Sequence, residues 1–158
     1  MKLVIQRTSG AEVRVDGEVV GRIGLGLVVF VGLERGDAEA QLDGAARRLA
    51  TLRVFEDDDG KMNRGLDEVG GAVLAVSQFT LAASIRKGRR PGFDRAMPGK
   101  LAEPLFVLFV EKLRAQGLSV ETGVFGATME VDLVNDGPVT LLWEDTPTGT
   151  GQKLKVES

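Results

Sequence analysis

The sequence predicts a single compact α/β domain, in which a mostly antiparallel, barrel-like sheet carries two helices. Short alternating or apolar segments recur between residues 2 and 144, separated by turns that contain Gly, which is typical of many short strands. Only two segments have apolar residues at helical spacing. The chain has 158 residues and neither a repeat nor a linker divides it, so it corresponds to about one domain.

The predicted strands are of two kinds. Most alternate between apolar and polar residues, which is typical of a strand with one buried face. The segments 27–34 and 72–78 are apolar almost throughout, which indicates central strands buried on both faces. The expected strands are 2–8, 11–15, 19–24, 27–34, 53–56, 72–78, 119–123, 129–135 and 138–144, with a hairpin turn at 16–18.

The helices have recognisable ends. Asp37 is positioned to cap the first helix, whose apolar residues recur to about residue 52. The second helix begins at Pro98 or at Glu103 and ends before Gly117. Because proline is tolerated only in the first turn of a helix, Pro104 favours a start near Glu103 or marks a kink.

The domain is expected to span residues 1–145, followed by a tail at 146–158 that is polar and without periodicity. Such composition predicts a disordered tail. The start of the sequence resembles a strand rather than a signal peptide, and no apolar run approaches the ~18 residues of a membrane span. We therefore expect a cytoplasmic protein that does not contact a membrane.

The composition limits the chemistry, because Cys, His and Tyr are all absent. Thiolate zinc sites, cysteine nucleophiles and Ser-His-Asp triads are thereby excluded. An enzyme of this composition must use main-chain amides, hydroxyls, carboxamides, carboxylates, Lys, Arg or its own substrate. The acidic run 57–59 predicts a solvated turn rather than a metal site, since consecutive side chains rarely converge on one ion. We expect neither a metal nor a cofactor.

Positive charge is concentrated between Ser84 and Lys100, although the whole chain has a net charge of −3. Six Lys or Arg residues there accompany the single acid Asp94. An ordinary solvated loop is one interpretation. The other is contact with nucleic-acid phosphates, which orients a nucleic acid without reading its bases. The short patch suggests a small footprint such as an RNA end, and its candidate contacts are Arg86, Lys87, Arg89 and Arg90.

Two polar segments interrupt well-patterned strands. The segment SQFTL (77–81) follows a buried strand, so its hydroxyls, carboxamide and main-chain N–H groups would line a pocket. The segment NDGPVT (135–140) places a Gly137–Pro138 corner between two strands, where proline cannot donate to the ladder, and this corner is a candidate for a cis bond. Each segment alone is more often a structural turn.

Together these segments resemble the D-aminoacyl-tRNA deacylase family, also called the D-tyrosyl-tRNA deacylases. The resemblance covers roughly residues 1–145. It rests on SQFTL and NDGPVT and is supported by the segments 6–26, 52–63, 86–93 and 121–131.

The resemblance implies an enzyme that hydrolyses the ester between a D-amino acid and the terminal adenosine of tRNA. The implied catalytic residues are Ser77, Gln78, Phe79 and Thr80. Main-chain N–H groups of Phe79 and Thr80 could stabilise the oxyanion, and the ribose 2′-hydroxyl of the RNA would assist the attacking water. The Thr80 hydroxyl remains open as a nucleophile or water-holder.

The resemblance further implies a homodimer with its active sites at the subunit interface. Gly137 and Pro138 of one subunit would reach the pocket of the other and reject L-amino acids sterically. Met129, Asn135 and Thr140 would bind the substrate or support the corner. Because glycine has no side chain to clash, the same filter predicts some cleavage of Gly-tRNA.

Two other function classes are compatible with the sequence. One is a non-catalytic RNA-binding module, which would need the basic segment but not the paired SQFTL and NDGPVT motifs. The other is a structural or interaction protein, which leaves the charge at 84–100 unexplained. Release of an amino acid from D-aminoacyl-tRNA separates the enzyme from both.

Overall fold

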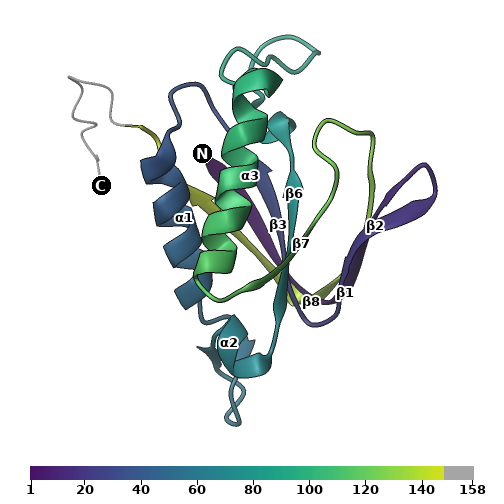
Figure 1. Ribbon diagram of the computed structural model, residues 1–158, viewed down its shortest axis with the longest axis vertical. Coiled ribbons are helices and arrows are strands. Elements are labelled where there is room, and N and C mark those ends of the chain that lie inside the picture. Colours follow the sequence, from purple (N-terminus) through teal and green to yellow (C-terminus); the bar gives the residue numbers. More distant parts are fainter. Residues whose placement is uncertain (148–158) are drawn as a thin grey trace.

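The structure is a computed structural model that describes residues 1–147 and is built from one curled sheet and two long helices (Figure 1). A two-stranded ribbon, a short helix and a 3-10 helix connect these parts. The elements in chain order are β1 (Lys2–Val15), β2 (Glu18–Ile23), β3 (Gly26–Gly32), α1 (Glu39–Thr51), β4 (Phe55–Glu56), β5 (Met62–Arg64), α2 (Leu66–Val69), β6 (Ala72–Ser77), η1 (Phe79–Ala82), α3 (Gly99–Ala115), β7 (Ser119–Thr122) and β8 (Glu130–Glu144).

The sheet is organised around the long strand β1. Its first half pairs with β3 and its second half with β2, while β8 runs along the other edge, and all three pairings are antiparallel. The strands β6 and β7 continue from β3 in parallel. Among the described residues β8 pairs with β1 alone, so it forms an edge of the sheet there.

The sheet curls until β2 approaches β7, which leaves it nearly closed. Gly21 of β2 lies so close to the Thr122 carbonyl of β7 that a Cβ at this position would collide with main-chain atoms. Glycine is therefore required at this close approach of two backbones. The barrel-like, mostly antiparallel sheet predicted from the strand pattern is thus confirmed.

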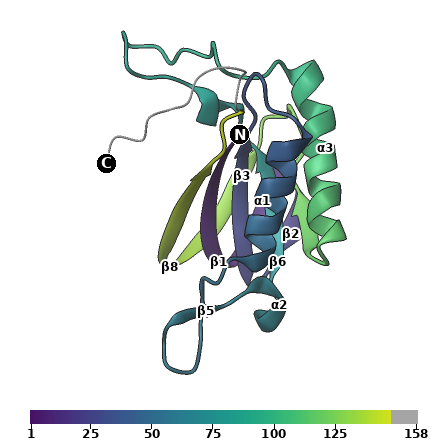
Figure 2. The same cartoon turned by 90° about the vertical axis from the view of Figure 1, so that its left-hand side faces the viewer.

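Apolar side chains form a core on each face of the sheet. On the outer face, Leu27 and Val29 of β3 pack with Leu42 of α1 and Phe109 of α3, all of which are fully buried. On the inner face, the curled sheet encloses a smaller cluster that includes Val28 of β3. Figure 2 shows both helices on the same side of the sheet. A strand buried on both faces must be apolar throughout, as β3 is.

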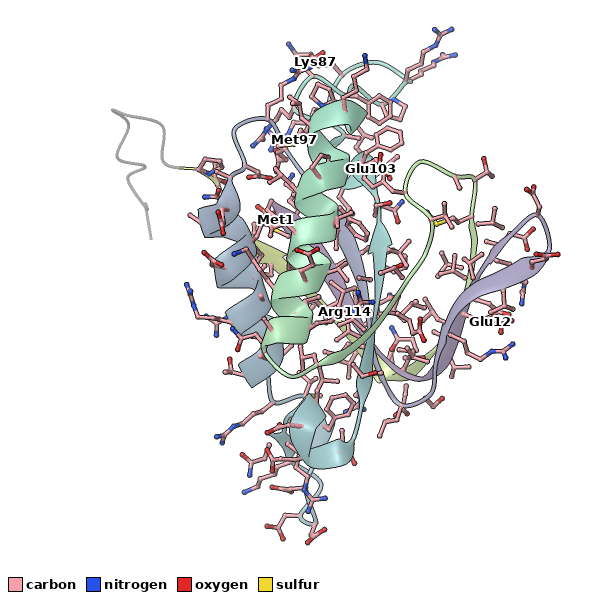
Figure 3. The ribbon with its side chains drawn as sticks, viewed as in Figure 1. Met1, Glu12, Lys87, Met97, Glu103 and Arg114 are labelled. Carbon is pink, nitrogen blue, oxygen red and sulfur yellow. The ribbon has the colours of Figure 1, made fainter. Side chains whose placement is uncertain are left out.

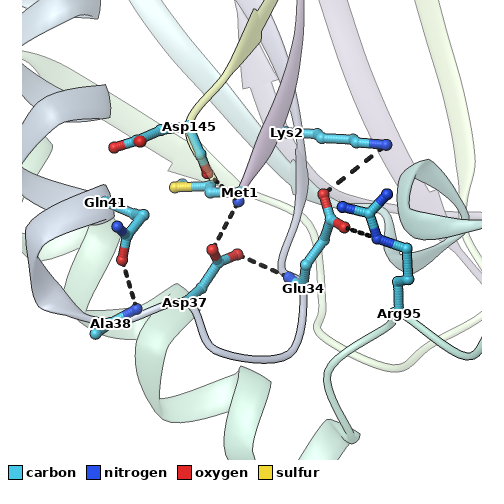
Figure 4. A network of polar contacts seen from close by, with 8 residues as sticks. All are labelled: Met1, Lys2, Glu34, Asp37, Ala38, Gln41, Arg95 and Asp145. Atoms are coloured by element: carbon cyan, nitrogen blue, oxygen red, sulfur yellow. Dashed lines mark hydrogen bonds and ion pairs between the residues drawn. The ribbon is translucent and has the colours of Figure 1, made fainter. Parts of the chain in front are cut away.

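A polar cluster joins the start of β1 and the end of β8 to the loop that follows β3 (Figure 4). The Met1 ammonium group lies 2.7 Å from Asp37 Oδ1 and 2.7 Å from the main-chain oxygen of Asp145. The other carboxylate oxygen of Asp37 accepts a 2.7 Å hydrogen bond from the main-chain N–H of Glu34. The Glu34 carboxylate pairs with Arg95 at 3.0 Å, so the cluster also fixes the base of the 84–95 segment.

The helix predictions need three corrections. Residues 1–147 contain three α-helices and the 3-10 helix η1 rather than two helices, because α2 and η1 are each a single short turn without apolar periodicity. Asp37 does not cap α1, since its carboxylate binds Met1 and Glu34 while the Gln41 side chain accepts from the N–H of Ala38. The start of the second helix favoured near Glu103 is wrong and the alternative at Pro98 is confirmed, because α3 begins at Gly99 with Pro98 as its N-cap residue and Pro104 lies inside the helix.

The strand predictions also change near the two polar segments. The strands expected at 129–135 and 138–144 are one strand, β8, with an irregularity between them. The strand expected at 72–78 ends at Ser77, and η1 begins two residues later. Most of the tail predicted to be disordered lies outside the described residues. None of the helices within residues 1–147 is long and apolar enough to cross a membrane.

Candidate active site

A pocket of about 430 Å³ opens where β3 and β6 end, beneath the first turns of α3. Its walls are mostly apolar, and within residues 1–147 none of its lining side chains is ionisable. Such a pocket provides no acid, base or charged electrophile of its own. The lining residues are Val31, Leu33, Val76, Ser77, Gln78, Phe79, Thr80, Met97, Gly99, Ala102, Phe106, Phe125, Gly126, Ala127, Met129 and Val131.

The structure brings all four residues expected to be catalytic, Ser77 to Thr80, to the rim of this pocket. The chain leaves the sheet here because Gln78 donates its main-chain N–H to Val31 at 2.7 Å and the next four residues form η1. The first N–H groups of a helix have no acceptor within it. The N–H groups of Phe79 and Thr80 are in this position and are therefore suited to binding an oxygen of a ligand.

The Thr80 hydroxyl is held by its neighbour Gln78. The Gln78 side-chain amide donates a 2.8 Å hydrogen bond to Thr80 Oγ1, which leaves the hydroxyl proton of Thr80 to be donated elsewhere. A carboxamide does not remove a proton from a hydroxyl at neutral pH. The arrangement favours a Thr80 that orients a water or a substrate group over a Thr80 that attacks as a nucleophile.

Met129 is the only one of the expected supporting residues that the structure places in the pocket wall. It lies just before β8 and packs against the inner core. A Cβ at Gly123 would lie 2.6 Å from Met129 Sδ, so the glycine makes room for this side chain.

The other predicted motif, at 135–140, lies outside the pocket of its own chain. In the ladder, five residue steps on β8 face only two on β1 between the pairs Gln6–Thr140 and Thr8–Asn135. The surplus residues bulge outward, and Gly137 and Pro138 are exposed and joined by a cis peptide bond.

The corner is separated from the pocket along the sheet. On β3, the partner of Arg7 is Leu27 and the partner of Ser77 is Val31. Four residues of strand span about 13 Å, so the corner and the pocket belong to opposite ends of β3.

Hydrogen bonds hold the corner in place. Asn135 Oδ1 accepts from the N–H of Val139 at 2.7 Å, and Asn135 Nδ2 donates to Thr140 Oγ1 at 3.0 Å. The expected residues Asn135 and Thr140 therefore contact the corner itself rather than the pocket. Arg7 adds a 2.9 Å hydrogen bond from Nε to the carbonyl of Asp136.

Sequence reasoning missed Arg7, whose side chain is only 7% exposed and also donates to the Val54 carbonyl at 2.7 Å. A signal was present, because Leu3, Ile5 and Arg7 alternate along β1 and the first two face the core. A charged residue at a position that alternation predicts to be buried needs fixed partners. Here the partners are main-chain carbonyls, one of them in the corner.

The four cations expected to contact RNA, Arg86, Lys87, Arg89 and Arg90, are exposed beyond the pocket. They lie on an excursion of the chain that closes where Ser84 and Gly92 exchange two 2.8 Å hydrogen bonds. Figure 3 shows Lys87 on this excursion, above the end of α3 near Met97. Within residues 1–147 none of the four takes part in an ion pair, whereas Arg95 is paired with Glu34. We call residues 84–92 the basic loop.

Known proteins share this architecture. A solved structure described as "c-Myc DNA Unwinding Element Binding Protein" is 40% identical, with a TM-score of 0.86 over 92% of this chain and 99% of its own. A second, described as a probable eukaryotic D-amino acid tRNA deacylase, has a TM-score of 0.76 over 90% of this chain and 97% of its own; at 20% identity it supports the fold alone.

Sequence relatives identify the family. The family described as D-Tyr-tRNA(Tyr) deacylase matches residues 4–144. A protein of Symbiobacterium thermophilum named D-aminoacyl-tRNA deacylase is 60% identical over 148 residues, which cover 94% of this chain and 98% of that protein. The chain therefore belongs to the D-Tyr-tRNA(Tyr) deacylase family, which confirms the resemblance carried by SQFTL and NDGPVT.

Proposed function

We propose that this protein hydrolyses the ester bond of D-aminoacyl-tRNA in the cytoplasm and releases the free D-amino acid and tRNA. The observation that carries the proposal is the pocket at Ser77–Thr80, which lies in a chain 60% identical to a D-aminoacyl-tRNA deacylase. The pocket offers main-chain and hydroxyl donors without an ionisable side chain. This suits an ester that is already activated and needs positioning more than a strong nucleophile.

Positioning and oxyanion binding supply the catalysis. Holding a water and an ester in reactive geometry contributes up to about 7–11 kcal/mol. A well-placed N–H donor contributes roughly another 10²–10³-fold, and the N–H groups of Phe79 and Thr80 have this role. The ribose 2′-hydroxyl next to the ester orients the water, and the Thr80 hydroxyl assists in holding it.

The functional unit is a homodimer in which the Gly137–Pro138 corner of the partner subunit completes each pocket. Two observations support this. The corner is exposed and does not line the pocket of its own chain. The strand β8 that carries it is a sheet edge with exposed apolar residues, including Leu142 at 73% exposure, and such an edge favours association.

The corner selects the D-enantiomer by exclusion. Attractive recognition of a side-chain group provides only about 1–3 kcal/mol, which is too little to protect the excess of correctly charged tRNA. Close-packed main chain at the substrate Cα rejects an L side chain more strongly. The D side chain then faces away from the filter, so many D-aminoacyl-tRNAs are substrates, and Gly-tRNA is cleaved to some degree.

The basic loop binds the phosphates of the tRNA acceptor end. The loop that carries its four exposed cations ends at Gly92, and the next residue, Phe93, lies against Phe79 of the pocket wall, so an RNA end that enters the pocket passes the loop. Contacts of this kind orient an RNA without reading its sequence.

The test is hydrolysis of tRNA charged with D-Tyr, L-Tyr or Gly, together with D-Tyr-tRNA whose terminal ribose lacks the 2′-hydroxyl. We expect rapid release of D-Tyr, slower release of Gly, no release of L-Tyr, and a large decrease in rate without the 2′-hydroxyl. Binding of D-Tyr-tRNA without release of the amino acid would contradict the enzyme and favour the RNA-binding module. Release of D-Tyr with Gly-tRNA untouched would contradict a purely steric filter at Cα.

A further inference from the structure

Two aromatic rings lie exposed and in contact beside the pocket. The ring of Phe79 is 60% exposed and that of Phe93 40% exposed, and their centroids are 5.2 Å apart at an interplanar angle of 48°. Exposed aromatic surface of this extent is costly in water and marks a site that a ligand covers.

Both rings stand on fixed supports. Phe79 begins η1, directly after the hydrogen bond of Gln78 to β3. Phe93 follows Gly92, which closes the basic loop, and it precedes Asp94, whose carbonyl accepts a 3.0 Å hydrogen bond from Arg35 Nε. The pair is therefore a rigid surface rather than two rings on a free loop tip.

The position of the pair relative to charge indicates the class of ligand. Phe79 lines the pocket on one side, and Phe93 is joined to the cationic basic loop on the other. Single-stranded nucleic acids bind where aromatic faces for the bases adjoin cations for the backbone. The aromatic pair lies between the pocket and the cationic loop. An RNA end that places its terminal nucleotide in the pocket would therefore place the next base at the aromatic pair and the preceding phosphates at the loop.

We propose that Phe79 and Phe93 form a stacking site for the unpaired base next to the terminal adenosine of the RNA. This inference rests on the proposed function for the direction in which the RNA enters. The site accepts any base, because every base has a π face, and its role is to hold the acceptor end so that the ester enters the pocket. Phe93 is the residue to vary, since Phe79 belongs to the pocket itself.

The test uses an acceptor-stem RNA with 2-aminopurine, a base whose fluorescence is quenched by stacking, at the penultimate position. We expect quenching with the unmodified protein and with Phe93→Tyr. Loss of quenching is expected with Phe93→Leu, which keeps apolar volume without a π face. Ile85→Ala is the matched control, because it removes an exposed apolar side chain of the basic loop that has no ring.

Affinity provides the second readout. Stacking of one base corresponds to roughly a 5- to 150-fold change in dissociation constant, so Phe93→Leu is expected to weaken binding within that range. The unmodified protein should bind an RNA that is abasic at the penultimate position more weakly than the intact RNA, by the same factor. The Phe93→Leu protein should bind the abasic and the intact RNA with equal affinity.

Three results would overturn the inference. The first is equal quenching with Phe93→Leu, and the second is independent, multiplying effects of Phe93→Leu and the abasic RNA. The third is a Phe93→Leu protein that sediments as a smaller species, because a second copy of the chain would then cover the rings. The RNA carries no amino acid, so quenching is observed whether or not the protein cleaves D-aminoacyl-tRNA. Failure of the proposed function is seen separately in the release assay.

Discussion

At the scale of single residues, the arrangement depends on which polar groups are fixed and which are left free. Arg7 is buried and donates to two main-chain carbonyls, while within residues 1–147 the first N–H groups of η1 have no main-chain acceptor. Buried donors must find acceptors, but donors at the rim of a pocket are able to bind a substrate. The backbone thus supports the corner at Gly137 and presents unused donors at the pocket of Ser77–Thr80.

Gly137→Ala is expected to lower the rate of D-aminoacyl-tRNA cleavage by about tenfold or more. Gly137 has a φ of 140°, and a Cβ there would lie 2.8 Å from Val139 Cγ2 and 3.0 Å from Arg7 Nη2, so the corner must move. The measurement is single-turnover release of D-Tyr. Gly117→Ala is the matched control, because Gly117 also has a positive φ but lies in open space at the end of α3. Equal effects of both variants would show that the corner is only a turn.

Arg7→Met is expected to reduce the free energy of unfolding by about 2–4 kcal/mol, since the buried bond to the Val54 carbonyl and the partly buried bond to the Asp136 carbonyl are lost. Cleavage of D-aminoacyl-tRNA should fall as well, at a temperature where the variant is folded, because the Asp136 carbonyl beside the corner loses its hydrogen bond from Arg7. Urea unfolding and the release assay measure the two effects. Arg22→Met is the control; Arg22 is exposed, and its pair with Glu12 should contribute less than about 1 kcal/mol. Full activity of folded Arg7→Met would show that the corner does not need Arg7 for cleavage.

At the scale of elements, the basic loop and the helices α1 and α3 differ in whether their cations are paired with acidic residues. Within residues 1–147 the four cations of the loop have no ion-pair partner, whereas α1 and α3 are joined by Lys112, which donates to Asp43 at 2.6 Å and to Glu39 at 2.7 Å. A free cation affects binding and a paired one affects docking of the helices. Charge removal in the loop should therefore change kinetics, and charge removal at Lys112 should change stability.

Replacing the four cations of the basic loop by Gln is expected to raise KM and to leave kcat unchanged, because these side chains orient the RNA before reaction. The dependence of log KM on log salt should become shallower by about 0.7 for each phosphate of the single strand that the protein no longer binds. Arg47→Gln combined with Arg48→Gln removes exposed charge from α1 and should change neither parameter. An unchanged KM in the loop variant would favour a solvated loop without a role in binding.

Lys112 predicts a specific pH dependence of stability. Its hydrogen bonds to Asp43 and then Glu39 raise the pKa of the ammonium group above its ordinary value of 10.5. Because the pKa of Lys112 is raised in the folded state, its contribution to the free energy of unfolding is complete below the unfolded-state pKa. The contribution is lost as pH rises through the folded-state pKa. The stability difference between Lys112→Met and the unmodified protein should therefore be constant from about pH 6 to 9 and should shrink only above 10.5.

Urea unfolding at a series of pH values measures this difference. Lys100→Met, at the exposed start of the same helix, is the control and should show no such alkaline change. A Lys112 contribution that disappears near pH 8 would contradict the assignment.

At the scale of the whole molecule, the two predicted motifs lie apart within one chain. The pocket and the Gly137–Pro138 corner belong to opposite ends of β3, so a site that uses both motifs requires a second subunit. This makes the proposed activity dependent on association along the exposed edge β8.

Mixing the two weakened variants Gly137→Ala and Gln78→Ala should raise activity above that of either variant alone if the site is shared. Gly137→Ala retains a sound pocket and Gln78→Ala retains a sound corner, so each mixed dimer contains one intact site. About one quarter of all sites should be active after exchange of subunits. The measurement is release of D-Tyr before and after mixing, with each variant alone as control. No recovery, although mixed dimers are present, would place both motifs in sites within one chain.

Local sequence patterns were sufficient to predict the barrel-like sheet, its central strands and the position of SQFTL at the end of a buried strand, but not the part of Arg7 at the corner. Alternation in β1 and the continuous apolar runs of β3 and β6 report burial directly, because burial of a strand face repeats every second residue. The short helices α2 and η1 left no such signal, since a single turn has no period. The N-cap at Asp37 failed because a tertiary partner, the Met1 ammonium group, binds that carboxylate.

The positions of the motifs relative to one another could not be predicted in this way. Spacing along the chain does not show that the corner bulges away from its own pocket, because the register of β8 on β1 determines this. Nor does it show that Arg95 is paired with Glu34, which is distant in sequence, while the four cations of the basic loop have no ion-pair partner in the part of the chain that the structure describes. The order of residues determines which chemical groups are close in sequence. How near groups far apart in sequence come to one another depends on how the strands pair.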